Sequence, residues 1–236
     1  MFDPQKLLEQ FLGGSTPANP QTNRTTGGVS PDFVKGFATG GVAGGLAGIL
    51  LGGKTSKKLA KGAVKLGGTA ALASLAYKAY NDWQATRNQP VATAEPPPMK
   101  DITPTPQGTP FLPSHPQQRD EMSLAILRAM IAAAKADGHI DAEEQRRIFG
   151  KLDELSLDTE EKAFVIDELR KPLDIDAVVA AAPTPELAVE IYAASFLAID
   201  PDDPAEQAYL AMLAARLKLD PALRTAVETE ALKTVA

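Results

Sequence analysis

The stretch that decides the fold is Ala134-Lys-Ala-Asp137-Gly-His-Ile-Asp141-Ala-Glu-Glu144-Gln-Arg-Arg-Ile148, because it recurs later in the chain. The second copy reads Leu197-Ala-Ile-Asp200-Pro-Asp-Asp203-Pro-Ala-Glu206-Gln-Ala-Tyr-Leu210. A constant offset of 62 residues aligns position 141 with 203, position 144 with 206 and position 148 with 210. The second turn is one residue shorter than the first, so position 137 pairs with position 200. Two copies of a helix–acidic turn–helix unit predict a helical bundle with a pseudo-two-fold repeat.

The acidic side chains of these turns have two interpretations. As helix caps, the second aspartate of each turn is an N-cap and the glutamate three residues later is its capping-box partner. As ligands, the six side chains form an oxygen-only cluster, suited to calcium, magnesium or manganese, if the two copies pack face to face. The predicted ligands are Asp137, Asp141, Glu144, Asp200, Asp203 and Glu206. A regular EF-hand is excluded, because Ala133 and Lys135 occupy its first two ligand positions.

Further helix-start signals follow the first turn. Asp158-Thr-Glu-Glu161 is a capping-box pattern, and Thr184-Pro185, Asp203-Pro204 and Asp220-Pro221 each place a capping side chain before a proline. Asp174 to Ala182 is expected to form a short helix, and no strand pattern is present. The sequence therefore predicts an all-α domain of about seven short helices over residues 119–236.

The N-terminal half contains an uncharged apolar run from Gly36 to Gly53, flanked by Lys35 and Lys54. As a helix it spans roughly 27 Å, close to the thickness of a bilayer core. Its glycines recur at every fourth position and form a stripe where a second helix can approach closely: Gly36, Gly40, Gly44, Gly48 and Gly52. We expect a glycine-zipper transmembrane segment that can self-associate; a glycine-rich linker is the alternative.

Five lysines follow the run and favour a basic amphipathic helix on an anionic membrane surface: Lys54, Lys57, Lys58, Lys61 and Lys65. The apolar run Leu66–Tyr80 is expected to continue along the interface, with Tyr77, Tyr80 and Trp83 as an aromatic belt, and a second span is the alternative. Residues 87–116 hold nine of the nineteen prolines and are typical of an extended linker.

These features predict four segments: a flexible segment at 1–30, a membrane segment at 31–86, a linker at 87–118 and a helical domain at 119–236. Residues 1–119 carry 12 Lys and Arg against 6 Asp and Glu, whereas residues 120–236 carry 12 against 24. An acidic domain is poorly suited to nucleic acid, whose phosphates require basic side chains. The chain has no cysteine, which excludes disulfides and thiolate ligands.

The phrase Ala134-Lys-Ala-Asp137-Gly-His-Ile-Asp141-x-x-Glu144 resembles the TerB-like helical domain of tellurite-resistance proteins. The order of a glycine-rich apolar part, a proline-rich linker and a C-terminal Leu217-Lys-Leu-Asp-Pro221 phrase is similar to the YebE family of bacterial inner-membrane proteins. The resemblance implies an all-α pseudo-symmetric domain, a metal-binding acidic face that includes Asp137, Asp141 and Glu144, and association with the inner membrane.

The chain shows no nucleophile–base pair, phosphate loop or dinucleotide fingerprint, so we expect no enzyme. The first hypothesis is a membrane-tethered domain that senses or scaffolds at the bacterial inner membrane, with a divalent cation on its acidic face as one option. The alternatives are a metal-free module whose acidic face docks a basic protein, and a metal-dependent hydrolase. A single span places the acidic domain in the cytoplasm, and two spans place it in the periplasm.

Overall fold

A computed structural model describes residues 2–12, 69–87, 106–136, 146, 148–150, 152, 157–199 and 203–235. The elements are helices, which confirms the predicted all-α class: α1 Pro4–Phe11, α5 Thr69–Arg87, α6 Pro116–Ala134, α8 Thr159–Arg170, α9 Ile175–Ala180, α10 Pro185–Leu197, α11 Pro204–Arg216 and α12 Pro221–Val235. Within the described residues the β-type pairing is confined to one isolated bridge between Gln107 and Leu112.

Local sequence sets where these helices begin. Asp158 and Glu161 form the predicted reciprocal capping box, in which the Asp158 carboxylate accepts from the Glu161 N–H at 2.8 Å and the Glu161 carboxylate accepts from the Asp158 N–H at 2.8 Å. Asp174 and Thr184 accept the third backbone N–H of α9 and α10. Each bond satisfies a donor that a helix start leaves without an intrahelical partner.

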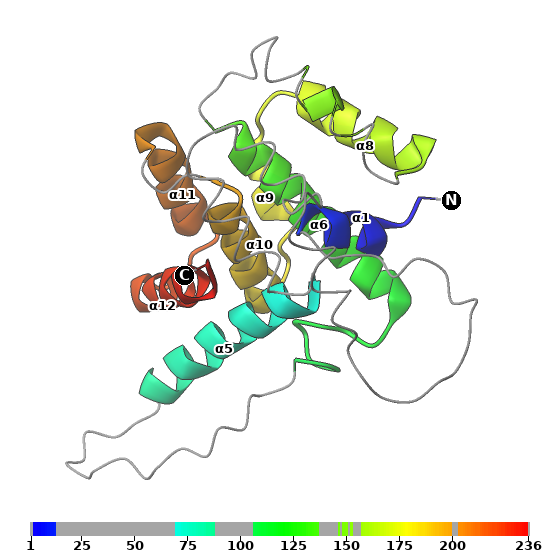
Figure 1. Ribbon diagram of the computed structural model, residues 1–236. Helices are drawn as coiled ribbons and strands as arrows, with labels where there is room; N and C mark the ends of the chain where they lie inside the picture. The colour runs from blue at the N-terminus through cyan, green and yellow to red at the C-terminus, as the bar shows by residue number, and fades with distance from the viewer. Residues whose placement is uncertain are drawn as a thin grey trace, which may run out of the picture.

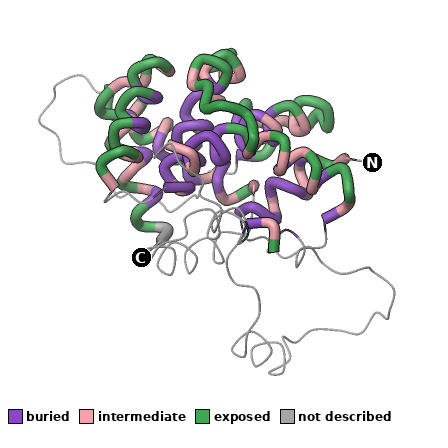
Figure 2. The backbone as a smooth tube through the Cα atoms, turned by 90° about the horizontal axis from the view of Figure 1, so that it is seen from above, coloured by how far each residue is buried: buried purple, intermediate pink, exposed green. Residues whose placement is uncertain are grey.

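Helix α10 lies at the centre of the bundle, beside α5, α6, α11 and α12 (Figure 1). Its mid-section is buried on every side, with no exposed surface on Val189, Ile191, Tyr192, Ala193 or Ala194. Figure 2 shows that the buried positions gather along the middle of the bundle, while the outer faces of the peripheral helices are exposed. A helix that is apolar all round belongs in such a central position.

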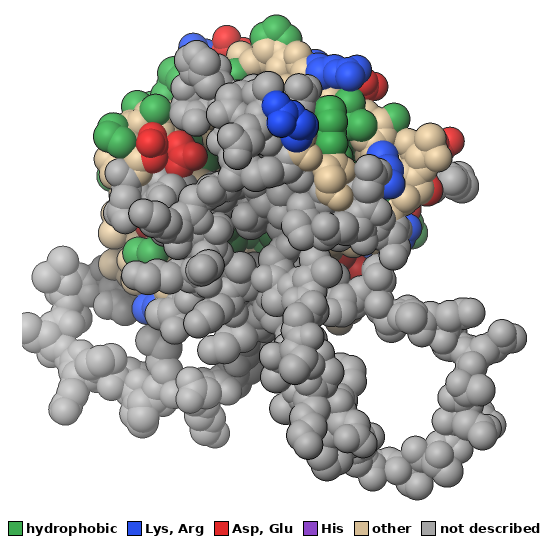
Figure 3. Space-filling model, turned by 45° about the horizontal axis from the view of Figure 1, so that its top comes forward, with side chains coloured by type: hydrophobic (Ala, Val, Ile, Leu, Met, Phe, Trp, Pro, Cys, Tyr) green, Lys and Arg blue, Asp and Glu red, His purple; other side chains and the backbone are tan. Residues whose placement is uncertain are grey.

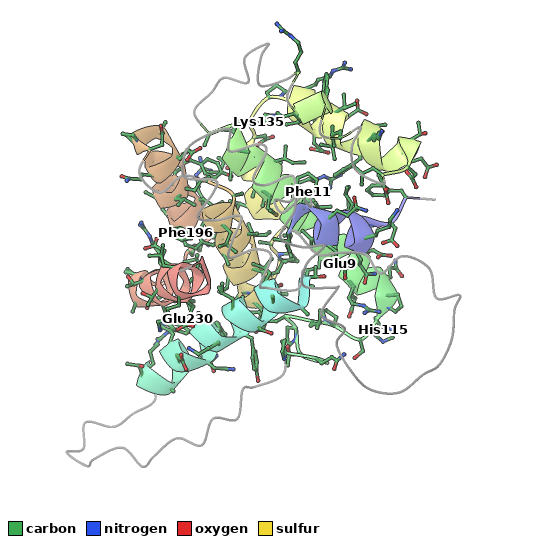
Figure 4. All side chains as sticks on the ribbon, in the orientation of Figure 1. Glu9, Phe11, His115, Lys135, Phe196 and Glu230 are labelled. Atoms are coloured by element: carbon green, nitrogen blue, oxygen red, sulfur yellow. The ribbon has the colours of Figure 1, made fainter. Side chains whose placement is uncertain are left out.

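The same packing arrangement occurs twice. Helix α1 packs on α6, and Phe2, which precedes α1, reaches α8, where its ring centroid lies 5.1 Å from that of Phe164. Helix α5 packs on α10 and α12, where the Lys78 ammonium lies 2.8 Å from the Glu230 carboxylate. Figure 4 labels Glu230 on α12. Helices α6 and α10, the first helices of the two sequence copies, pack against each other. The repeat in the sequence therefore corresponds to two packed pairs, α6 with α8 and α10 with α12, and helices from outside the repeat, α1 and α5, pack on the first and the second pair.

Residues before 119 contribute to this common core. Leu7, Leu8 and Phe11 of α1 are buried against the bundle, as are Leu72 and Ala76 of α5. The Leu66–Tyr80 run was expected at a membrane interface, but its described part, from Thr69 on, packs against α10 and α12. Small alanines at helical spacing on α5 permit this close approach. Tyr77 and Tyr80 pack on Phe111, with ring centroids 5.6 and 5.5 Å away, rather than forming an aromatic belt.

The predicted span Gly36–Gly53, its glycine stripe, the lysines from 54 to 65 and most of the proline-rich linker lie outside the described residues. No helix in the described ranges is both long and apolar enough to cross a bilayer. Membrane insertion and self-association through the glycines therefore stay predictions.

Candidate functional site

Of the six predicted ligands, only Asp203 and Glu206 belong to the described residues. Asp203 is the N-cap of α11: its Oδ1 atom accepts from the backbone N–H of Ala205 at 2.8 Å and of Glu206 at 3.1 Å. The capping interpretation is thus confirmed at this position. Asp137, Asp141, Glu144 and Asp200 lie outside the described residues, so the proposed meeting of the two clusters stays a prediction.

The described part of the acidic face fits a helix start better than a cation site. One carboxylate oxygen of Asp203 already accepts hydrogen bonds from two backbone N–H groups, as an N-cap requires. Only the other oxygen is then left to bind a metal. Among the described side chains, no three His, Asp or Glu groups come together in a metal-binding arrangement. A cation site here depends on the four residues outside the described ranges.

Lys135, which directly precedes the first acidic turn, has a structural role. Its ammonium donates to the backbone carbonyls of Glu168, at 3.1 Å, and of Lys171, and so binds the C-terminal end of α8 to α6 (Figure 4). Burial lowers the pKa of Lys135 from its ordinary value. A cleft of about 430 Å³ opens beside this contact, between α6, α9 and the end of α8. Because two of its three donors bind backbone carbonyls at the C-terminal end of α8, Lys135 stabilises the fold at this position.

A second cleft, which we call the α5–α12 cleft, lies where the end of α5 meets the loops that precede α10 and α12. It has a volume of about 730 Å³. Its apolar walls come from Tyr80, Trp83, Val179, Leu217, Leu219 and Leu223, and Pro183 and Pro185 lie on the loop side. Arg87, Arg216, Lys218 and Asp220 also line it. Pockets of this size with apolar walls and a few charged groups are typical of ligand and peptide sites.

The charged groups of this cleft are arranged around Trp83. The guanidinium of Arg87 stacks on the Trp83 ring at 4.8 Å from its centroid. The pKa of Asp220 lies below its usual range, chiefly because the Ala222 backbone N–H donates to its carboxylate. Arg216 pairs with Asp176 at the surface. On the face of the molecule shown in Figure 3, acidic and basic side chains are interspersed, and neither sign of charge forms a continuous patch among the described residues.

One partly buried and one fully buried acidic side chain have contrasting surroundings. Glu228 of α12 accepts from the Tyr192 hydroxyl at 2.6 Å and from the Arg224 guanidinium at 2.8 Å. Burial and this carboxylate together raise the pKa of Tyr192. Glu190 of α10 is only 1% exposed, and its Oε2 atom has no hydrogen-bond partner. Burial raises the pKa of Glu190 well above its ordinary value, so its neutral form is favoured in the fold.

Comparison with protein families gives a match to the model described as "Protein of unknown function (DUF533)", over residues 36–231. This range covers most of the chain. The chain belongs to the DUF533 family. The family is TerB-like, in agreement with the resemblance carried by the first acidic turn.

A relative of this DUF533 protein occurs in Yersinia enterocolitica, where it is described as an uncharacterized protein in the ampR 5' region. The two are 29% identical over 111 residues, which is 47% of this chain and 80% of the relative. No solved structure matches the chain significantly.

The α5–α12 cleft was not predicted from the sequence. Trp83 and Arg87 were assigned to a membrane belt and to the start of a linker, and Lys218 received no role. One usable signal was the spacing of Leu72, Ala76 and Ala79, which places three apolar residues on one helix face. That pattern predicts a buried helix, but it does not identify the partner helix or the cleft that forms at its end.

Proposed function

We propose that this DUF533 protein is a non-enzymatic scaffold of the bacterial inner membrane, whose helical domain holds a partner protein there. The membrane half of the proposal rests on the uncharged Gly36–Gly53 run and the lysines that follow it. The partner-binding half rests on the concave, mixed apolar and charged α5–α12 cleft. Similarity to the YebE family supports the membrane location as an expectation.

The packing of α1 and α5 sets a condition on the membrane topology. Helix α1 ends at Phe11, before the predicted span, and α5 begins at Thr69, after it, yet both pack in one core with α6 and α10. A single crossing between them would place the two helices on opposite sides of the bilayer. We therefore replace the single-span hypothesis with one in which α1 and the helical domain lie on the same side and the Gly36–Gly53 run enters the bilayer without crossing it.

The five lysines at 54–65 favour the cytoplasmic side for this shared domain, because positively charged segments near a membrane segment stay in the cytoplasm. A metal-dependent sensing role remains a separate prediction, since it depends on residues outside the described ranges.

The topology can be tested directly because the chain has no cysteine of its own. Glu9→Cys in α1 and Ala208→Cys on the exposed face of α11 provide one label site on each part of the core. In spheroplasts, a membrane-impermeant maleimide should label neither cysteine until the cells are lysed. Labelling of the two sites from opposite sides would refute the shared-core topology, and labelling of both from outside would refute the cytoplasmic location.

Membrane attachment needs its own measurement. Full-length protein should remain in the membrane pellet after carbonate extraction, because an inserted apolar run is not displaced by high pH. Recovery in the supernatant would refute insertion while leaving the helical domain and its cleft unaffected.

A further inference from the structure

The α5–α12 cleft combines an apolar interior with a cationic rim. Trp83 from α5 lines this cleft together with Leu217 and Leu219 from the loop before α12. Three cations line the cleft, Arg87, Arg216 and Lys218, against one anion, Asp220. This excess of positive charge contrasts with residues 120–236 as a whole, where Asp and Glu outnumber Lys and Arg by 24 to 12.

The cations differ in how far the protein already satisfies them. Arg216 is paired with Asp176, but both side chains are at least half exposed, and such pairs exchange readily with a competing anion. Lys218 is exposed and forms no ion pair within the described part of the chain. Arg87 lies over the face of Trp83, and its guanidinium has five N–H donors.

Lys218 also has an unfavourable backbone conformation. It follows the C-cap of α11 with φ of 56°, the one positive φ among the described non-glycine residues. The flanking hydrogen bonds, Lys218 N–H to Ala215 and Leu219 N–H to Ala214, are those of a Schellman motif. Glycine is the usual residue at this position, because a side chain crowds the carbonyl oxygen in the left-handed conformation. The chain therefore keeps a cation at the rim of the cleft where glycine fits the backbone better.

We propose that the α5–α12 cleft binds an acidic peptide segment of a partner protein, with an aromatic or aliphatic side chain of that segment in the apolar interior and its carboxylates on Arg87, Arg216 and Lys218. The proposal rests on the partner-binding half of the function proposed above and is independent of membrane attachment. The charge of the rim selects an acidic segment rather than a basic one. The concave shape suits a peptide side chain better than a flat membrane surface.

The test uses Trp83, which is the only tryptophan in the chain and lies in the cleft. Purified full-length protein, in mild detergent, is titrated with an array of Trp-free synthetic peptides that place Phe, Tyr or Leu among Asp and Glu. Peptides of the acidic array should shift the Trp83 emission and should lose affinity as salt is added. A matching array with Lys in place of Asp and Glu should leave the emission unchanged.

Two variants and one control identify the binding surface by labelled-peptide anisotropy. Arg87→Gln and Lys218→Gly should each weaken acidic-peptide binding, by up to about fivefold for the loss of one exposed charge pair. Lys218→Gly should do so without lowering the unfolding midpoint, since glycine suits the left-handed backbone. Arg170→Gln is the matched control: Arg170 is likewise an exposed arginine in the last turn of its helix, but on α8. It should not change the affinity.

Five results would overturn the proposal. The first is that acidic peptides leave the Trp83 emission unchanged, and the second is that basic peptides bind equally well. The third is that Arg170→Gln weakens binding as much as the two variants do. The fourth is that the chain self-associates and Lys218→Gly abolishes this association, which would mean that a second copy of the chain occupies the cleft. A response to anionic lipid vesicles without a response to the peptides would likewise assign the cleft to the membrane. None of these results bears on carbonate extraction, so failure of this proposal and failure of membrane attachment are distinguishable.

Discussion

Replacing Glu190 by methionine should change how the stability of the protein depends on pH. Glu190 is buried in the central helix α10, and its Oε2 atom has no hydrogen-bond partner. Methionine has a similar length and no charge, so it can fill the same space without a group that ionises. Burial raises the pKa of the carboxyl in the fold well above its ordinary value of 4.5.

The direction of the effect follows from proton linkage. Below the ordinary pKa of 4.5, the carboxyl is protonated in both the folded and the unfolded chain and has no pH-dependent effect on stability. Between that value and the raised pKa of the fold, the unfolded chain releases the proton while the folded chain holds it. The free energy of unfolding therefore falls with rising pH, by up to about 1.4 kcal/mol per pH unit from this single group.

The assay is urea unfolding of the full-length wild type and the variant, at steps from about pH 4 to pH 8. Other carboxyl groups titrate in both proteins, so the informative quantity is the difference between the two unfolding free energies at each pH. The Glu190→Met variant should gain stability relative to wild type as pH rises above about 4.5, along the slope given above. Glu186→Met is the control, because Glu186 lies one turn earlier on α10 and is only half-buried. Parallel pH profiles for wild type and Glu190→Met would refute the reasoning, since they would mean that Glu190 ionises equally easily in both states.

Further substitutions test an ion pair between α1 and α8 and the cap of α11. Lys6→Met should lower the free energy of unfolding by about 1–2 kcal/mol in urea titrations, because it leaves the fully buried Glu161 carboxylate, 3.2 Å from the Lys6 ammonium, without that partner; an unchanged midpoint would contradict this role of α1. Asp203→Ser should cost little, and Asp203→Ala about 1 kcal/mol, because serine caps a helix nearly as well as aspartate. If the acidic turns bind a cation, magnesium or calcium at a hundredfold excess over the dissociation constant should stabilise wild type by about 2.7 kcal/mol, and Asp203→Ser should abolish this gain. A wild-type melting temperature that does not change with the ion, at constant ionic strength, would refute the metal hypothesis.

The sequence by itself determined the helical class and most of the helix starts that the structure describes. Asp158, Thr184 and Asp203 each cap a helix as predicted, and Asp174 caps the short helix expected at 174–182. These features could be read from the chain because capping depends on a side chain and a backbone N–H only two or three residues away. The repeat was also readable, since aligned copies of one motif are a property of the sequence alone.

The tertiary structure decided which helices share a core, and therefore where the α5–α12 cleft forms. Nothing within α5 distinguishes a helix that lies on a membrane from one that packs on α10, because both require an apolar face. The burial of Glu190 likewise depends on the helices that surround α10 and not on its neighbours in sequence. Contacts between residues far apart in the chain are set by the packing of whole helices, and it is these contacts that bring Trp83, Arg87 and Lys218 to one cleft.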